Sequence, residues 1–272
     1  MQNSKVAPST ISAAALLALA ACGGGGGDAP ATQQPGNTTP PAPTIAVTGS
    51  AATVSADPLA VVFVPHTEKA TVPAPQSIAH AAFPAQFQKV ATQGAYSQVG
   101  IDANSLISFA SGKIVEVAGN GDYSIGRWTD GSSSLGSVSV NQGDHYVLGK
   151  PLALTRTPGP TAKLNCSLLS STSPTAVSGN FAPGKVTNAA AVIDLNGPLL
   201  ESFNVSLAIG SDASASATVT STTISGVAIV NGSLAHVQVM GTDATHPLLA
   251  VGFTMPTPSS GDVNGIVVLK CQ

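Results

Sequence analysis

The stretch Phe203-Asn-Val-Ser-Leu-Ala-Ile209 places an apolar side chain at every second position and a small or polar one between them. A period of two is typical of a half-buried β-strand. Further strand-like segments follow between Gly, Asn and Asp residues, namely 164–168, 189–195, 215–219, 223–230, 237–239, 248–253 and 263–270. About eight short strands at this spacing indicate an all-β fold, in which we predict that residues 159–272 form a small antiparallel β-barrel, with a β-sandwich as the alternative.

The first 21 residues have the layout of a secretory signal peptide. Lys5 supplies a cation, and a run rich in Ala and Leu extends from Ile11 to Ala21. That run is too short to cross a bilayer core of about 30 Å as a helix. No other apolar run in the chain approaches about 20 residues, so we expect no transmembrane helix. Residues 1–21 are therefore predicted to direct export and to be removed.

The apolar run ends in Leu19-Ala20-Ala21-Cys22, and five glycines follow. This tetrapeptide resembles the lipobox of bacterial lipoproteins, in which the cysteine thiol is acylated and the peptide is cut before it. Palmitate or similar chains on Cys22 would anchor the protein to a membrane. Gly23 stands where lipoproteins kept in the inner membrane commonly carry Asp, so the resemblance implies the outer membrane, on its cell-surface or periplasmic face. Secretion with an incidental cysteine is the alternative.

The composition predicts a tether after Cys22 and limits the kinds of partner that the protein can bind. Residues 22–43 consist largely of Gly, Pro, Thr, Gln, Asn and Ala, which predicts a flexible, disordered tether. Only 8% of the whole chain is charged and its net charge is −3. A weakly acidic chain without clustered Lys and Arg argues against a nucleic-acid partner.

Two further cysteines remain if Cys22 carries lipid. Cys166 lies in the first strand of the predicted barrel and Cys271 ends the last. In an oxidising compartment such a pair is expected to form a disulfide, for which the chain-entropy estimate is at most about 4.7 kcal/mol. Because bridged residues must be close, the first and last strands would be neighbours, as they are in a closed barrel. Two unrelated buried thiols are the alternative.

Residues 44–158 are predicted to form a β-rich N-terminal region. The run 59–64 is long and β-branched enough for a buried strand, whereas 70–104 shows little pattern. Segments 113–117 and 123–128 flank Asn120-Gly121, a pair that favours the type I′ turn of a β-hairpin. A second hairpin is predicted from 136–140 across 141–144 to 145–148.

Three short motifs carry a family resemblance. They are Gly126-Arg-Trp-Thr-Asp-Gly131, His145-Tyr-Val-Leu-Gly149 and Leu168-Leu-Ser-Ser-Thr-Ser-Pro-Thr175. Their order is similar to that in bacterial envelope proteins that end in a barrel like that of transferrin-binding surface lipoproteins. The resemblance covers roughly residues 105–272, while Ile125 and the cysteine pair depart from it. It implies a lipid-anchored, eight-stranded barrel, and some members of that family capture host iron-carrying proteins or haem.

No compact motif for catalysis or metal binding stands out. The five histidines are scattered, without the spacing of a metal-ligand motif, and no Gly-x-Ser-x-Gly elbow occurs. Asp243-Ala-Thr-His246 is interpreted as a turn, and His236 as part of a solvated strand face shared with Gln238. We therefore predict no catalytic residues, no metal and no cofactor.

Arg127 and Trp128 are the candidate binding residues of the folded part, since Arg and Trp are favoured at interaction hot spots. The alternative places the single Trp in the core with Arg127 beside it. The sequence thus predicts a non-catalytic binding or surface module that is attached to the membrane by lipid and binds an extracellular protein or a small ligand. An envelope hydrolase with a site built from loops and a structural envelope component are the alternatives.

Overall fold

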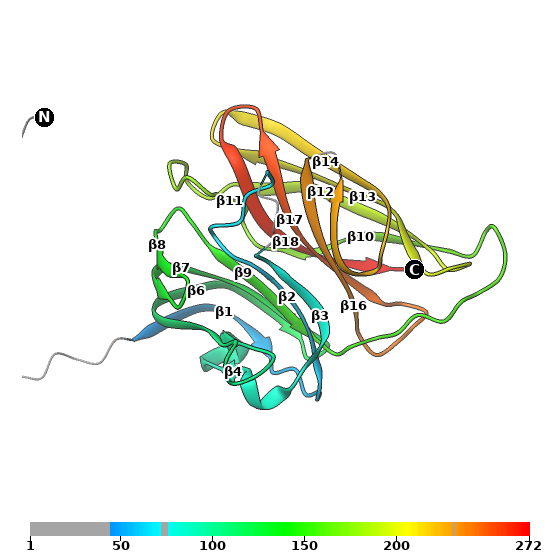
Figure 1. Ribbon diagram of the computed structural model, residues 1–272, viewed down its shortest axis with the longest axis horizontal. Helices are drawn as coiled ribbons and strands as arrows, with labels where there is room; N and C mark the ends of the chain where they lie inside the picture. The colour runs from blue at the N-terminus through cyan, green and yellow to red at the C-terminus, as the bar shows by residue number, and fades with distance from the viewer. Residues whose placement is uncertain (1–43, 72–75, 231) are drawn as a thin grey trace, which may run out of the picture. The chain divides into compact units, whose positions relative to one another are not determined.

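The computed structural model describes residues 44–71, 76–230 and 232–272. The predicted signal peptide 1–21, lipidation at Cys22 and tether 22–43 lie outside the described residues. The described residues belong to one compact unit, Ala42–Gln272, and form two curled β-sheets, so the predicted all-β class is confirmed (Figure 1). Among them, no helix has the length and apolar character needed to span a membrane.

The first sheet follows the strand order β3-β2-β9-β7-β6-β5-β4. β1 joins it by pairing in parallel with β6, and β8 pairs with β7. Two short 3₁₀ turns, η1 and η2, flank β4. The elements are β1 Ile45–Ala52, β2 Leu59–Val64, β3 Ile78–Phe83, η1 Ala85–Phe87, β4 Lys89–Val90, η2 Thr92–Gly94, β5 Tyr96–Val99, β6 Ile107–Asn120, β7 Tyr123–Ser133, β8 Gly136–Val138 and β9 Asp144–Gly149.

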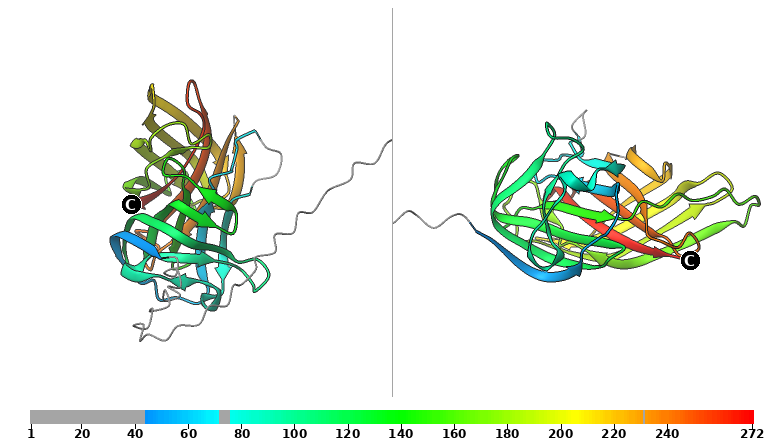
Figure 2. Two further views of the ribbon diagram at one scale, coloured as in Figure 1. Left: turned by 90° about the vertical axis from the view of Figure 1, so that its left-hand side faces the viewer. Right: turned by 90° about the horizontal axis from the view of Figure 1, so that it is seen from below.

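The second sheet follows the order β14-β13-β12-β10-β18-β17-β16-β15, and the short β11 pairs with β18. All eight strands predicted after residue 159 are present, and the yellow-to-red strands of Figure 2 curl around one another. The strands are β10 Lys163–Ser171, β11 Thr175–Ala176, β12 Lys185–Asp194, β13 Leu199–Ile209, β14 Asp212–Thr222, β15 Ser225–Val230, β16 Ser233–Met240, β17 Leu248–Thr257 and β18 Gly261–Cys271.

The disulfide joins two neighbouring strands in the middle of the second sheet. Cys166 of β10 and Cys271 of β18 lie directly opposite each other and are bonded, so the predicted bridge and the predicted neighbourhood of first and last strands are confirmed. The sheet is a nearly closed barrel rather than a sandwich. Its open position lies between β14 and β15, which are the two ends of the strand path.

The first predicted hairpin is present, with a different turn. β6 and β7 pair down to Gly119 opposite Ser124, which leaves Gly121 and Asp122 at the centre of the turn. Gly121 has φ +92, and neither Asn120 nor Asp122 has a positive φ. A type I′ turn needs positive φ at both central residues, so the type I′ prediction on Asn120-Gly121 is wrong; glycine first with one positive φ is the type II′ pattern.

The second predicted hairpin is wrong. β8 and β9 do not pair with each other; both pair with β7, with Val138 opposite Gly131 and Asp144 opposite Trp128. The two short strands therefore follow one another along one edge of β7, because the loop between them returns the chain to that edge. Alternation alone predicts strands but does not say which strand is the partner.

Each sheet encloses its own apolar core. The core of the first sheet collects side chains from strands all around it, with Trp128 at its centre. The core of the second sheet does the same with mostly aliphatic side chains, to which Phe203 and Phe253 are added. Each sheet is thus curled around a packed interior.

A third apolar layer joins the two sheets. It holds Ala60, Val62 and Val64 of β2 together with residues of β7, β9, β16, β17 and β18. β2 is buried on both faces, because its other side chains point into the first core, which confirms the buried strand predicted at 59–64. Gly252 lets β2 come close: a Cβ there would lie 2.5 Å from Val64 Cγ2.

Candidate functional site

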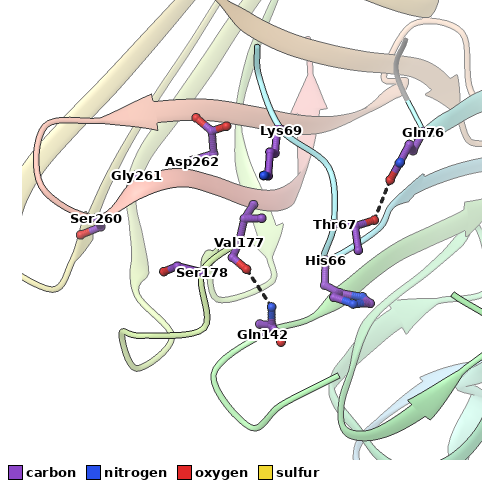
Figure 3. A pocket seen from close by; sticks show the side chains of 10 residues that line it. All are labelled: His66, Thr67, Lys69, Gln76, Gln142, Val177, Ser178, Ser260, Gly261 and Asp262. Atoms are coloured by element: carbon purple, nitrogen blue, oxygen red, sulfur yellow. Dashed lines mark hydrogen bonds between the residues drawn. The ribbon is translucent and has the colours of Figure 1, made fainter. Parts of the chain in front are cut away.

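An open groove of about 870 Å³ lies where the two sheets meet. Figure 3 shows its side chains coming from the segment between β2 and β3, the loop before β9, the loop after β11 and the turn that leads into β18. Most of them are polar, and Val177 is the only aliphatic one. The lining residues are His66, Thr67, Lys69, Gln76, Gln142, Val177, Ser178, Ser260, Gly261 and Asp262.

Residues 65–70, which we call the strap, form one wall of the groove and connect the sheets. The strap turns directly after β2, where the Glu68 N–H donates to the Pro65 carbonyl at 3.0 Å. The second sheet holds it from β18: Asn264 Nδ2 donates to the Pro65 carbonyl at 2.9 Å, and the Ala70 N–H donates to Asp262 Oδ2 at 3.2 Å.

His66 holds the strap to the first sheet. Its backbone N–H donates to Oδ1 of Asp144 at 2.8 Å, and its Nδ1 lies 2.7 Å from the same oxygen. Since an ionised carboxylate only accepts hydrogen bonds, Nδ1 carries the proton and Nε2 is left free of this contact. Asp144 is fully buried, and His66 is 6% exposed at the groove. This is the geometry of a carboxylate that orients a histidine ring.

Glu68 and His236 form a second carboxylate–histidine pair behind the groove. His236 Nε2 lies 3.6 Å from Glu68 Oε1, an ion-pair distance that is too long for a hydrogen bond, and both side chains are buried. Burial alone would raise the pKa of Glu68, but His236 and the Gln76 amide lower it below its ordinary value. The predicted solvated face for His236 is wrong, because the strap and the first sheet cover that side of β16.

The sequence motifs behind the family resemblance meet at this same boundary. His145 of β9 is completely buried, and its ring contacts two hydroxyls of the segment after β10: Nδ1 lies 2.8 Å from Thr172 Oγ1 and Nε2 lies 2.9 Å from Thr175 Oγ1. Burial holds the pKa of His145 well below its usual value, and repulsion from Arg127, and from His66 when that ring is protonated, adds to this effect.

Arg127 makes a bidentate ion pair with Glu116 of β6. Its Nη2 and Nε lie 2.8 and 3.2 Å from the two carboxylate oxygens, and the Ser173 N–H donates to Glu116 Oε2 at 2.8 Å. A bulge between β6 and β7 gives Glu116 a φ of +61. Burial alone would raise the pKa of Glu116, but Arg127 and Ser173 lower it.

Arg127 and Trp128 do not form an exposed patch, so that candidate binding surface is corrected. Trp128 is fully buried and stacks on Phe109 at a centroid distance of 5.5 Å, while its Nε1–H donates to the Tyr96 carbonyl at 2.7 Å. Arg127 is 5% exposed and is paired with Glu116. The alternative, a core Trp with Arg127 beside it, describes both residues.

The other predicted residues lie away from the groove lining. Cys166 and Cys271 form the disulfide at the β10–β18 pair. Asp243 and His246 form an exposed turn, as predicted, in which the Thr245 hydroxyl and His246 lower the pKa of Asp243. No three His, Cys, Asp or Glu side chains of the described residues are placed to hold a metal ion.

The sequence did not predict the His66–Asp144 and Glu68–His236 pairs, because the two members of each pair are far apart in the chain. His66 and Asp144 are separated by 78 residues, and no local spacing connects them. One signal was available in the sequence. His66 and Glu68 directly follow the buried run 59–64, and ionisable side chains so close to a buried strand need either hydrogen-bond partners or access to solvent.

Comparison with known proteins gives no match to a family model, to a curated protein or to a solved structure. The resemblance to transferrin-binding surface lipoproteins therefore stays a prediction from the sequence motifs.

Proposed function

We propose that this chain is a lipoprotein of the bacterial outer membrane whose groove binds a polar ligand without chemical turnover. The observation that carries the proposal is the position of the groove: both sheets enclose interiors filled by apolar side chains, whereas the groove between them has about 870 Å³. Ligand sites typically occupy about 300–1,000 Å³ and favour boundaries between structural units.

The lining of the groove indicates the kind of ligand. Hydroxyl and amide side chains predominate, and Lys69 and Asp262 supply one charge of each sign. Such a surface offers its ligand several hydrogen-bonding groups together with the carbon stems of the same side chains. A protein loop or a polar small molecule would suit it, and both are compatible with the capture role that the family resemblance implies.

Anchoring is the second part of the proposal. Leu19-Ala20-Ala21-Cys22 supports acylation at Cys22, and the 22 residues from there to position 43 would hold the folded unit away from the lipid surface, at the cell surface or in the periplasm. A domain that lipid holds at the membrane can bind a ligand there without catalysing a reaction, which suits a binding module.

Binding can be tested by blocking the groove. We expect Ser178→Trp to abolish the thermal stabilisation that a defined panel of peptides, glycans, haem and iron chelates gives to the wild-type protein. Ser214→Trp, on an exposed position of β14, is the matched control and should leave the stabilisation unchanged. A ligand that stabilises all three proteins equally would place binding elsewhere.

The anchor is tested separately by mass spectrometry of the membrane fraction. The expected species begins at Cys22 and carries acyl chains, and Cys22→Ser should release the protein from the membrane. An unmodified Cys22 in a soluble product would refute the anchor and leave the groove unaffected. Protease treatment of intact cells then distinguishes the cell surface from the periplasm.

A hydrolase is the second candidate, and the His66–Asp144 pair favours it. An oriented histidine at a groove is the arrangement of a general base, with Asp144 fixing the ring. If this candidate holds, the purified protein should cleave model esters or peptides, and His66→Gln should remove that activity while the protein stays folded. Equal background cleavage by both proteins would leave the binding module as the function.

A further inference from the structure

We propose that at least one ordered water molecule binds at a buried polar site behind the groove and links the strap to the second sheet. We call it the inner site, and its side chains are those of Glu68, His236, Thr254 and Asn264. The proposal concerns the folded unit itself and does not depend on the ligand of the groove.

The side chains of the inner site are buried and keep polar atoms without a hydrogen-bond partner in the part of the chain that the structure describes. Each of these residues is at most 2% exposed. The atoms without a partner are Glu68 Oε1, both ring nitrogens of His236, Thr254 Oγ1 and Asn264 Oδ1. Because buried polar atoms in folded proteins are nearly always hydrogen-bonded to protein or to ordered water, a cluster of such atoms points to bound water.

The register of the second sheet places three of these side chains on one face. Thr254 of β17 lies directly opposite Asn264 of β18, and His236 of β16 lies opposite Gly252, two residues before Thr254. The residue that precedes each of the three in sequence belongs to the apolar core of the second sheet. Since side chains alternate along a strand, the three polar ones point away from that core, toward the strap.

The strap brings Glu68 to the same place. The Pro65 carbonyl accepts from the Glu68 N–H at 3.0 Å and from Asn264 Nδ2 at 2.9 Å, so the strap turn and the Asn264 amide are held together. Glu68 Oε2 accepts from the Gln76 N–H at 2.7 Å, whereas Oε1 lies 3.6 Å from His236 Nε2. That distance is too long for a direct hydrogen bond, but a water molecule beside the pair can reach both atoms at about 2.8 Å.

The mixture of donors and acceptors selects water as the ligand. The carboxylate oxygen of Glu68 and the amide oxygen of Asn264 only accept, the Thr254 hydroxyl can donate, and a neutral imidazole has one N–H and one acceptor nitrogen. A bound cation needs acceptors around it, and a bound anion needs donors. Water donates and accepts, and a buried water typically makes about three hydrogen bonds, so it suits a mixed site.

The inner site supports the groove from behind. Glu68 lies between Thr67 and Lys69, which line the groove, while its own side chain points to the second sheet. Water that bonds Glu68 to β16, β17 or β18 therefore adds a contact between the groove wall and that sheet, next to the direct contact from Asn264 to the strap.

Thr254→Val tests the inner site by the sign of its effect on stability. Valine keeps the shape of threonine and lacks the hydroxyl. If water bonds this hydroxyl, the variant loses a hydrogen bond, and we expect the unfolding equilibrium constant of the full-length protein to rise about fivefold, as for one net hydrogen bond. If the site is dry, removing an unpartnered buried hydroxyl should lower that constant instead. Thr220→Val, at an exposed position of β14, is the control for placing valine in a strand.

A high-resolution crystal structure of the wild type detects the water directly. We expect a water molecule within about 3.2 Å of Glu68 Oε1 and of at least one other atom of the inner site. Oxygen-17 relaxation dispersion should detect its long residence in solution, and the signal should be smaller in Thr254→Val.

Two results would overturn the proposal. One is a Thr254→Val protein that, after correction by Thr220→Val, is as stable as the wild type or more stable. The other is a crystal structure in which the side chains of the inner site bond only to protein atoms, with no water among them. Should Thr254→Val fail to fold, the crystal structure of the wild type decides the question. Neither result depends on whether the groove binds a ligand.

Discussion

In the first sheet β2 pairs with the last strand, β9, by hydrogen bonds alone, whereas in the second sheet the first and last strands, β10 and β18, are also joined by the Cys166–Cys271 disulfide. The first sheet begins with β1, which pairs with β6, so only the second sheet places its first and last strands side by side. The strand order ends at β3 and β4 in the first sheet and at β14 and β15 in the second. The two sheets are therefore curled with different strand orders and different means of stabilisation.

The two sheets also differ in the side chains that fill their interiors. Six aromatic rings pack in the first core, and they are those of Phe63, Phe83, Tyr96, Phe109, Trp128 and Tyr146. The second core is mainly Val, Leu, Ile and Ala. Aromatic side chains bury about 150–250 Å² each, so a small sheet can be held by them without a covalent bond. A core of smaller side chains gains more from a cross-link that limits the unfolded chain.

The largest expected effect comes from removing the cross-link. Replacing Cys166 and Cys271 together by Ser should lower the free energy of unfolding by about 4 kcal/mol, because the closed loop spans 105 residues. Urea unfolding gives the free energy, and hydrogen exchange should show the loss in the second sheet first. Equal loss of protection in both sheets would contradict the contrast between them.

Glu116→Gln should cost about 3 kcal/mol, because it leaves the buried guanidinium of Arg127 without its counter-charge. The pKa of Glu116 is lowered in the folded protein, so its contribution is complete above the ordinary value near 4.5 and is lost as the pH falls through the lowered value. Denaturation at a series of pH values should show the variant and the wild type converging only in strong acid. A difference that does not depend on pH would refute the charge argument.

Trp128→Phe should lower the free energy of unfolding by about 2 kcal/mol, through a partial cavity and the lost hydrogen bond to the Tyr96 carbonyl. Near-ultraviolet circular dichroism and urea unfolding measure it. Phe253→Leu in the second core is the comparison, and it should affect the exchange of the second sheet instead.

The smallest effect tests the layer that joins the sheets. Gly252→Ala places a methyl group 2.5 Å from Val64 Cγ2, so we expect a loss of about 1–2 kcal/mol. Gly197→Ala is the matched control, since a Cβ there meets nothing within 4 Å. If the two variants unfold at the same urea concentration, the close approach of β2 is not limiting. Thermal unfolding should stay a single transition if the sheets unfold together.

The candidate site was predictable only in part. The motifs around Arg127, His145 and Leu168–Thr175 were identified in the sequence, and the structure brings them to one boundary, though in the interior rather than on a surface. The strap pairs could not be predicted, because a hydrogen bond between residues 78 positions apart leaves no local pattern.

The sequence by itself determined most of the strands outside residues 70–104, the alternation of side chains between two faces and the neighbours joined by the disulfide. A period of two fixes which side chains share a face, and two cysteines at the first and last strands fix which strands touch. Only the tertiary structure decided what covers each face. His236 alternates as an outward residue would, yet the strap and the first sheet lie over it, because a strand's periodicity distinguishes two faces without saying whether water or a second sheet meets them.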